Sequence, residues 1–237
     1  MQNNLLIKVH SLNGIGVVKP AATRYNFGSM FGTGAEVMLG FKLNPTAAFA
    51  VGFARMHYFM NQSKVNQTLS DSYSQPWLSA TVSSTKNSAL IQNSLFIRLS
   101  GWRQKTKSIF EYYGNMGIGS FQYKLNSRVL QQSNSSAYNF TRTFAGGISN
   151  TSFILGAGIH YSYPLSKTIY LSSGAAYHYN LTPRTYLYEK NVYANGDEAT
   201  YQVELPTPSH FLLVQVGLMY KPNKPCNCKN MGLDAIR

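Results

Sequence analysis

Hydrophobic residues alternate with small or polar residues along most of this chain, with a period of two. In residues 34–43 the odd positions are Ala35, Val37, Leu39, Phe41 and Leu43, and the even positions are Gly34, Glu36, Met38, Gly40 and Lys42. Such alternation is typical of a β-strand with one apolar face and one mixed face. A second run, 47–60, follows the turn sequence Asn44-Pro45-Thr46, so the two runs predict a hairpin. Each run has the length of a strand that crosses a bilayer at a tilt.

The same pattern returns in six further segments, which brings the predicted strands to eight. These segments are 4–20, where the pattern is weakest, and 89–102, 109–123, 151–163, 169–181 and 210–220. For one strand the sequence does not decide which side chains face inward. In 47–60, Arg55 and His57 share a face with Phe49, Val51 and Phe53, so either a bulge changes the phase or the aromatic side chains face inward.

The connections between these strands alternate between long and short. The long ones are polar and span 21–32, 61–86, 125–149 and 182–208; in the last, Tyr186–Val192 and Thr200–Val203 could extend as strands. Outer-membrane barrels have an even number of strands, short periplasmic turns and long extracellular loops. The rhythm therefore predicts an all-β fold, an eight-stranded antiparallel up-and-down transmembrane β-barrel over residues 1–222. The residues 223–237 then form a periplasmic tail.

Composition agrees with a barrel in a membrane. Only 12% of the residues are charged, against about 25% in a typical soluble domain, and there are 17 Tyr and 13 Phe. Aromatic residues fall near the strand ends, which predicts two interfacial girdles. The predicted turn-side girdle is Trp102, Tyr161, Tyr163 and Tyr220, and the predicted loop-side girdle is Tyr58, Phe121, Tyr123 and Tyr179.

The formal net charge is +13, but the basic residues are spread along the chain in no run longer than two. This distribution argues against a nucleic-acid-binding surface. The basic residues are then expected to face solvent or an anionic lipid surface. No window of about twenty predominantly apolar residues is present, so a transmembrane helix is not expected.

The pattern resembles the small eight-stranded outer-membrane barrels of the OmpA-domain and OmpX type. The ending Gly217-Leu-Met-Tyr-Lys-Pro222 resembles the last strand of outer-membrane β-barrel proteins common in Bacteroidota, although here about fifteen residues follow it. The resemblance implies the bacterial outer membrane, with its lipid and lipopolysaccharide as surroundings. It also implies contacts with other outer-membrane or periplasmic proteins. Since such barrels are exported with a signal peptide and none is visible, the chain is expected to be the mature form.

Charged residues on the mixed face are the candidate site in the lumen. They are Glu36, Lys42, Arg98 and Glu111, and a register that pairs residue 98 with residue 111 across the turn at 101–107 would set Arg98 against Glu111. Buried charges must be paired, so we expect a salt-bridge network that plugs the barrel. The alternative is an ion path or gate, but an eight-stranded barrel is filled by its own side chains.

An enzyme would need a nucleophile with a base beside it. His160 and His178 lie on the mixed face among many serines, and a Ser-His-acid set near the rim would resemble the lipid A deacylases, which are also eight-stranded barrels. No spacing marks a nucleophile, however. We therefore expect no catalytic residues, no cofactor and no metal site. Cys226 and Cys228 are too few for a disulfide framework or a zinc site, and remain candidates for docking of the tail.

The sequence thus favours a non-enzymatic structural or interaction component, an accessory subunit of a larger outer-membrane complex. A lipid A-modifying enzyme and a narrow ion channel are the alternatives.

Overall fold

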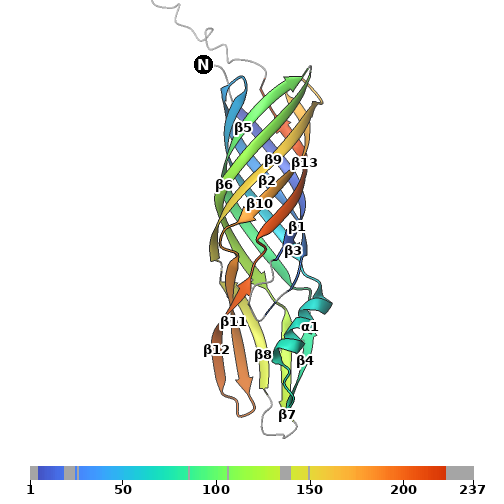
Figure 1. Ribbon diagram of the computed structural model, residues 1–237, viewed down its shortest axis with the longest axis vertical. Coiled ribbons are helices and arrows are strands. Elements are labelled where there is room, and N and C mark those ends of the chain that lie inside the picture. Colours follow the sequence, from blue (N-terminus) through green and yellow to red (C-terminus); the bar gives the residue numbers. More distant parts are fainter. Residues whose placement is uncertain are drawn as a thin grey trace, which may run out of the picture.

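The computed structural model describes residues 5–18, 25, 27–84, 86–105, 107–133, 140–148 and 150–222. Eight long antiparallel strands close into a barrel in the order β1-β13-β10-β9-β6-β5-β3-β2 (Figure 1). The barrel strands are β1 (Leu5–Val17), β2 (Met30–Asn44), β3 (Ala47–Phe59), β5 (Ala89–Lys105), β6 (Ser108–Lys124), β9 (Asn150–Pro164), β10 (Ile169–Asn180) and β13 (His210–Tyr220). The predicted fold class is confirmed, and each predicted strand lies at its expected place.

The stagger of the strands follows from their register. A row of paired residues that leaves β6 at Phe110 passes through Tyr161, Ser173, Val216, Ser11, Ala35, Arg55 and Asn93 and returns to β6 at Ser120. The row therefore climbs ten residues in one circuit of the barrel. With the usual strand spacing, this shear tilts the strands by about 40°, inside the range for closed barrels. Such a barrel is narrow enough for its own side chains to fill.

The phase of β3 is settled by its continuous pairing with β5 from Ala47 to Phe59. No bulge interrupts this pairing, so Phe49, Val51, Phe53, Arg55 and His57 all point outward. Their neighbours Ala50, Ala54 and Met56 are buried in the lumen.

The outer wall of the barrel is apolar. Large side chains exposed on it include Val37, Leu39, Leu95, Leu99, Ile118, Leu155, Leu171, Val214 and Leu218. The two girdles are only partly as predicted. Tyr161, Tyr163, Tyr179 and Tyr220 do lie on the outer face, but Trp102, Tyr58, Phe121 and Tyr123 are buried inside. Those four occupy the inward phase of their strands, which strand ends alone do not reveal.

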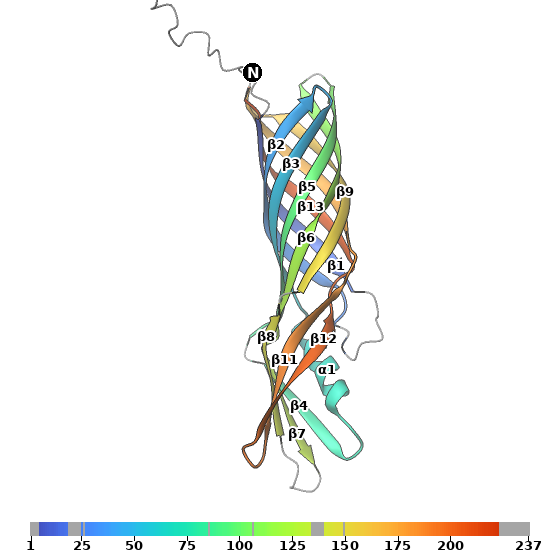
Figure 2. The same cartoon turned by 90° about the vertical axis from the view of Figure 1, so that its left-hand side faces the viewer.

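The long connections fold into a second unit, the distal sheet, which extends the barrel at the end away from the short turns (Figures 1 and 2). Its strands are β4 (Leu78–Ser84), β7 (Ser127–Ser133), β8 (Phe140–Ile148), β11 (Arg184–Tyr193) and β12 (Glu198–Pro206), in the order β12-β11-β8-β7-β4. The interpretation of 61–86 and 125–149 as polar loops is therefore wrong. The suggested strands at 186–192 and 200–203 are present in β11 and β12.

A single helix, α1 (Gln62–Tyr73), packs against β4 and β7 of the distal sheet. Asn61 caps its N-terminus, since the Asn61 side-chain oxygen accepts a hydrogen bond from the Lys64 backbone at 3.2 Å. Val65, Leu69 and Tyr73 recur every four residues and form its buried face. This face shares one core with the distal part of the lumen, so barrel and distal sheet form one packed body. Within the described ranges, no helix is long and apolar enough to cross a bilayer.

Candidate functional site

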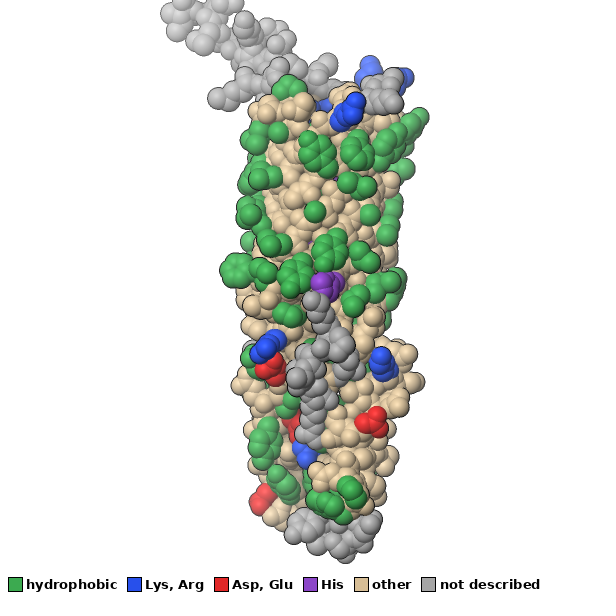
Figure 3. All heavy atoms as spheres, viewed as in Figure 1, with side chains coloured by type: hydrophobic (Ala, Val, Ile, Leu, Met, Phe, Trp, Pro, Cys, Tyr) green, Lys and Arg blue, Asp and Glu red, His purple; other side chains and the backbone are tan. Residues whose placement is uncertain are grey.

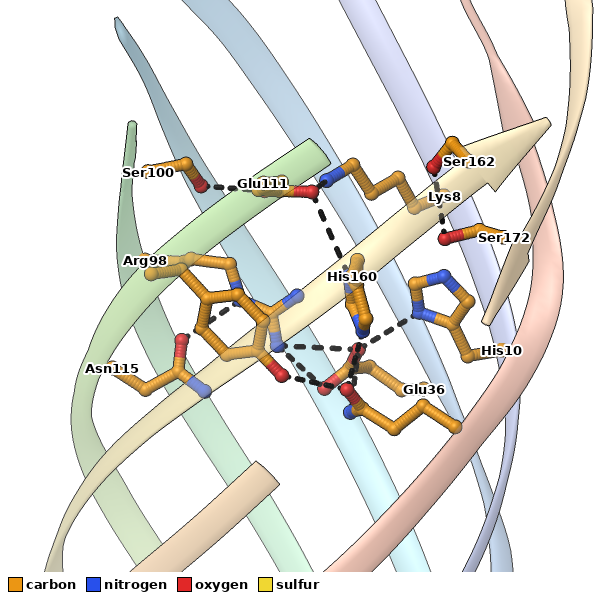
Figure 4. A network of polar contacts seen from close by, with 12 residues as sticks. Lys8, His10, Glu36, Arg98, Ser100, Glu111, Asn115, His160, Ser162 and Ser172 are labelled. Atoms are coloured by element: carbon orange, nitrogen blue, oxygen red, sulfur yellow. Dashed lines mark hydrogen bonds and ion pairs between the residues drawn. The ribbon is translucent and has the colours of Figure 1, made fainter. Parts of the chain in front are cut away.

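A layer of charged side chains fills the middle of the lumen. Four strands supply it: Lys8 and His10 from β1, Glu36 from β2, Arg98 from β5 and Glu111 from β6 (Figure 4). Every one of these side chains is almost completely buried. Opposite charges meet in pairs, because Lys8 bonds to Glu111 and Arg98 lies 3.1 Å from the Glu36 carboxylate. Each strand places its charge inward through the alternation of its residues.

Neutral side chains complete the bonding of both carboxylates. Ser100 donates to Glu111 at 2.6 Å, and the His10 ring nitrogen lies 3.1 Å from Glu36. Gln215 on β13 links further groups, because it accepts a hydrogen bond from Tyr113 at 2.6 Å and donates to Glu36 at 3.4 Å. Several partners hold each carboxylate rigidly, whereas Nη1 of Arg98 and Nε2 of His10 have no hydrogen-bond partner among the described residues.

Two predicted details of this site differ in the structure. Arg98 was expected against Glu111, but β5 and β6 pair up to Lys105 and Ser108, so Arg98 lies opposite Asn115 and donates to it at 2.8 Å. The predicted Arg98–Glu111 pair is therefore wrong, since the turn begins later than expected and the register moves by four residues. Lys42 forms no ion pair with any described residue; it lies near the turn-side end, 5.0 Å from the Trp102 ring centre.

Two apolar layers enclose the charged layer. On the turn side, Leu6, Ala48, Trp102, Ile109, Tyr170 and Met219 form one cluster. On the distal side, Leu12, Met56, Tyr58, Phe121 and Phe211 belong to the large core. Two cavities between these layers measure about 20 and 10 Å³, which is room for about one water each. The described lumen is thus packed along its length.

His160 and His178 both lie inside this packed lumen. His160 bonds to Gln215 and is fully buried, and His178 lies 3.3 Å from the side-chain amide of Asn115. Ser162 and Ser172 bond to each other at 3.2 Å. No serine hydroxyl among the described residues is hydrogen-bonded to either imidazole, so the two histidines act here as network members.

The sequence analysis missed Lys8 and His10 as members of the site. The signal was present, since Leu6, Lys8, His10 and Leu12 occupy alternate positions of the first strand. Residues 4–20 were read as a strand without assigning which positions face inward. Tyr113 and Gln215 give no sequence signal of their own, because neutral residues of this kind occur on both faces.

A second polar cluster ties the distal sheet to α1. Tyr73 at the end of α1 donates to Glu189 on β11 and contacts Tyr25, while Arg142 on β8 bonds to the same carboxylate. Burial, followed by its neighbours Tyr25 and Glu189, raises the pKa of Tyr73 well above the usual range of a tyrosine. Gln131 on β7 also donates to the Tyr73 backbone at 2.6 Å. Hydrogen bonds and an ion pair therefore hold the inner face of the distal sheet against α1.

The outer face of the distal sheet points away from α1. Register aligns Arg128, Thr143 and Lys190 across it in one row, and Leu130, Thr141 and Val192 in the next. Tyr188 adds an aromatic ring that is 41% exposed. This outer face is the candidate interaction site of the molecule.

Cys226 and Cys228 of the tail lie outside the described residues. Their predicted role in docking stays a prediction.

Charge and hydrophobicity are distributed along the molecule as a bilayer requires. On the face shown in Figure 3, hydrophobic side chains are spread over the barrel wall. Lysine and arginine side chains appear at the turn-side end, and both basic and acidic side chains appear over the distal sheet. An apolar wall of this kind is stable against lipid and costly in water.

Comparison with known proteins supports the same conclusion. No known protein family and no curated protein matches the sequence. Among solved structures, Neisserial surface protein A is similar with a TM-score of 0.52 at 12% identity, over 94% of this chain and 99% of that one. A major outer membrane protein from Thermus thermophilus is similar with a TM-score of 0.50 at 11% identity, over 91% and 98%. At these identities the likeness shows the fold alone.

The closed barrel fold and its apolar outer wall together identify the protein as an eight-stranded β-barrel of the outer membrane. The predicted localisation is confirmed. The narrower resemblance to OmpA-domain and Bacteroidota barrels stays a prediction.

Proposed function

We propose that the protein is a non-enzymatic interaction component, an accessory subunit of a larger outer-membrane assembly. In this proposal the barrel is an anchor and the distal sheet is the working part. The observation that carries it is the distal sheet itself, a folded unit built from three long connections and held at the end of the barrel away from the short turns (Figure 2). A barrel that served only to fill the membrane would need no such unit.

The chemistry of the outer face suits a protein partner. It combines threonine hydroxyls, the Tyr188 ring and the two cations Arg128 and Lys190. Tyrosine and arginine are enriched at the centres of protein interfaces, and small hydroxyl side chains supply adaptable hydrogen bonds. The edge strand β12 pairs on one side only, with β11, so its other side could accept an added strand from a partner.

The two alternatives receive less support. A channel needs a path through the lumen, where a charged layer lies between two apolar layers. A lipid-modifying enzyme needs a nucleophile and base that lipid can reach, whereas His160 is fully buried.

The test is co-purification from native membranes in gentle detergent. We expect Arg128→Ala with Tyr188→Ala to lose a protein that wild type retains. Arg103→Ala with Tyr163→Ala is the matched control, since it removes the same residue types at the turn side, and it should keep that protein. If full-length protein retains no partner, the accessory-subunit proposal fails and a stand-alone surface barrel remains.

The tail is proposed as a second contact on the periplasmic side, through residues 223–237 with Cys226 and Cys228. Deleting 223–237 should then remove part of the co-purifying set. An unchanged set would show that the tail is no docking element.

A further inference from the structure

Polar side chains interrupt the apolar outer wall on one side of the barrel. They form the wall patch, which comprises Asn13 on β1, Thr33 on β2, Arg55 and His57 on β3, and Asn93 on β5. Register makes them neighbours: Asn13, Thr33 and His57 lie in one row, and Arg55 and Asn93 lie side by side in the next. Directly paired residues have Cβ atoms about 5 Å apart, so the five side chains share one area of the wall. Of the strands that carry them, β2, β3 and β5 face the viewer in Figure 2.

The wall patch lies in the distal half of the apolar band. Arg55 is eight residues beyond Ala47, where β3 begins, which places it about 20 Å above the short turns at the measured tilt. The apolar band of such barrels is about 25 Å tall. At about this height on the far side, β6 and β9 carry the apolar side chains of Ile118 and Leu155. Such barrels have their long connections on the extracellular side, which sets the patch against the outer leaflet.

These side chains have no polar partners within the part of the chain that the structure describes. Neither Arg55 nor Asn93 forms a side-chain hydrogen bond or ion pair there, and the same holds for Asn13 and Thr33. His57 contacts only a ring, that of Phe59, at 4.9 Å between ring centres. In the lumen, by contrast, the buried Arg98 is paired with Glu36. An exposed, unpaired arginine facing lipid is costly, so a counter-charge from outside the described residues would stabilise it.

We propose that the wall patch is a binding site for the phosphorylated headgroup of an outer-leaflet lipid. A guanidinium matches the geometry of a phosphate with two parallel hydrogen bonds, and it keeps its charge at every physiological pH. Asn93 and Thr33 supply neutral hydrogen bonds beside it. Phe53, exposed on the same strand and two residues closer to the membrane centre than Arg55, packs against the apolar part of the lipid. The site depends on the barrel alone and not on the distal sheet.

The test is native mass spectrometry of the purified protein with bisphosphorylated lipid A and with dephosphorylated lipid A. Wild type should retain the phosphorylated form about tenfold better, as one charge-assisted pair predicts. Arg55→Gln with His57→Gln should bind both forms equally. Arg55→Lys should keep part of the preference, because it preserves the charge without the bidentate geometry. Arg103→Gln, an arginine at the turn-side end, is the matched control and should behave as wild type.

Folding of each variant is checked by the change of gel mobility on boiling. Equal retention of phosphorylated lipid A by wild type and by Arg55→Gln with His57→Gln overturns the proposal. So does a wild type that does not distinguish the two lipids, a comparison that stands even if the double variant fails to fold. If the double variant loses a co-purifying protein and keeps its lipid, the patch is a protein interface and the lipid proposal is wrong.

Discussion

Glu111 illustrates how strongly single residues are coupled in the lumen. It bonds to Lys8 from β1 and to Ser100 from β5, so its carboxylate ties the β5–β6 hairpin to the first strand of the chain. The alternation of apolar and polar residues along β6 predicts that the Glu111 side chain points into the lumen. The alternation does not predict the partner of Glu111. That partner depends on the register of the hairpin, and a shift of the turn by two residues changes every residue pair in it.

Replacing Glu111 should leave a buried cation without its partner. We expect Glu111→Gln to lower the free energy of unfolding by about 3–5 kcal/mol, since Lys8 then stays charged and unpaired in the lumen. Lys8→Met with Glu111→Gln should recover most of the loss. Urea titration of the protein in lipid vesicles measures both. Glu204→Gln, which breaks the more exposed Arg184 pair at 3.2 Å, is the control and should cost less than about 1 kcal/mol. A Glu111→Gln variant as stable as this control would contradict the prediction.

Glycine residues on the lumen face also affect stability, because they let neighbouring strands approach each other closely. A Cβ at Gly217 would lie 1.9 Å from the Val9 carbonyl oxygen and 2.6 Å from the His10 Cα. Both are backbone atoms of the neighbouring strand, which cannot move without opening the barrel seam.

We therefore expect Gly217→Ala to destabilise the barrel by about 1–3 kcal/mol or to prevent its closure. Gly114 offers the matched control, since a Cβ there would have its nearest neighbour at 3.9 Å, so Gly114→Ala should be neutral. The fraction that changes gel mobility on boiling reports on closure. Equal fractions for the two variants would rule out crowding at this seam.

At the scale of elements, the long barrel strands were predictable, as were β11 and β12 of the distal sheet, whereas α1, β4, β7 and β8 were not. The barrel strands alternate over eleven or more residues because one face meets lipid and the other meets the lumen. β4 and β7 are short and polar, with seven residues each, and their pairing depends on contacts with α1. For α1 the signal was Val65, Leu69 and Tyr73 after the cap Asn61, a spacing easily overlooked in a polar stretch.

The Tyr73 hydroxyl should hold this unit together. Tyr73→Phe removes the bonds to Glu189 and Tyr25 and leaves a buried carboxylate with fewer donors, so we expect a loss of about 1–3 kcal/mol confined to the distal sheet. Limited proteolysis should cut the variant faster within the helix and the distal strands, at 62–84, 127–133, 140–148 and 184–206, while boiling still changes its gel mobility. Tyr188→Phe, on the exposed outer face, is the control and should be cut at the wild-type rate. Unchanged cleavage of Tyr73→Phe would show that this hydroxyl does not hold the sheet.

At the scale of the whole molecule, the lumen is sealed by layers. The charged layer carries fixed ion pairs, and the apolar layers on either side offer no groups to replace the hydration of an ion.

We therefore expect purified protein in a planar bilayer to give no stepwise conductance. A porin measured in the same bilayer is the positive control. Reproducible steps from wild type would contradict the packed lumen and restore the channel alternative.

The distal sheet joins strands from three separate connections: β4 from the second, β7 and β8 from the third, and β11 and β12 from the fourth. These segments become neighbours only when the barrel hairpins beneath them have paired. Any antibody epitope that spans the sheet is therefore discontinuous. Such an antibody would recognise cells whose barrel has been inserted and closed, and no linear peptide cut from this chain would compete with it or elicit it.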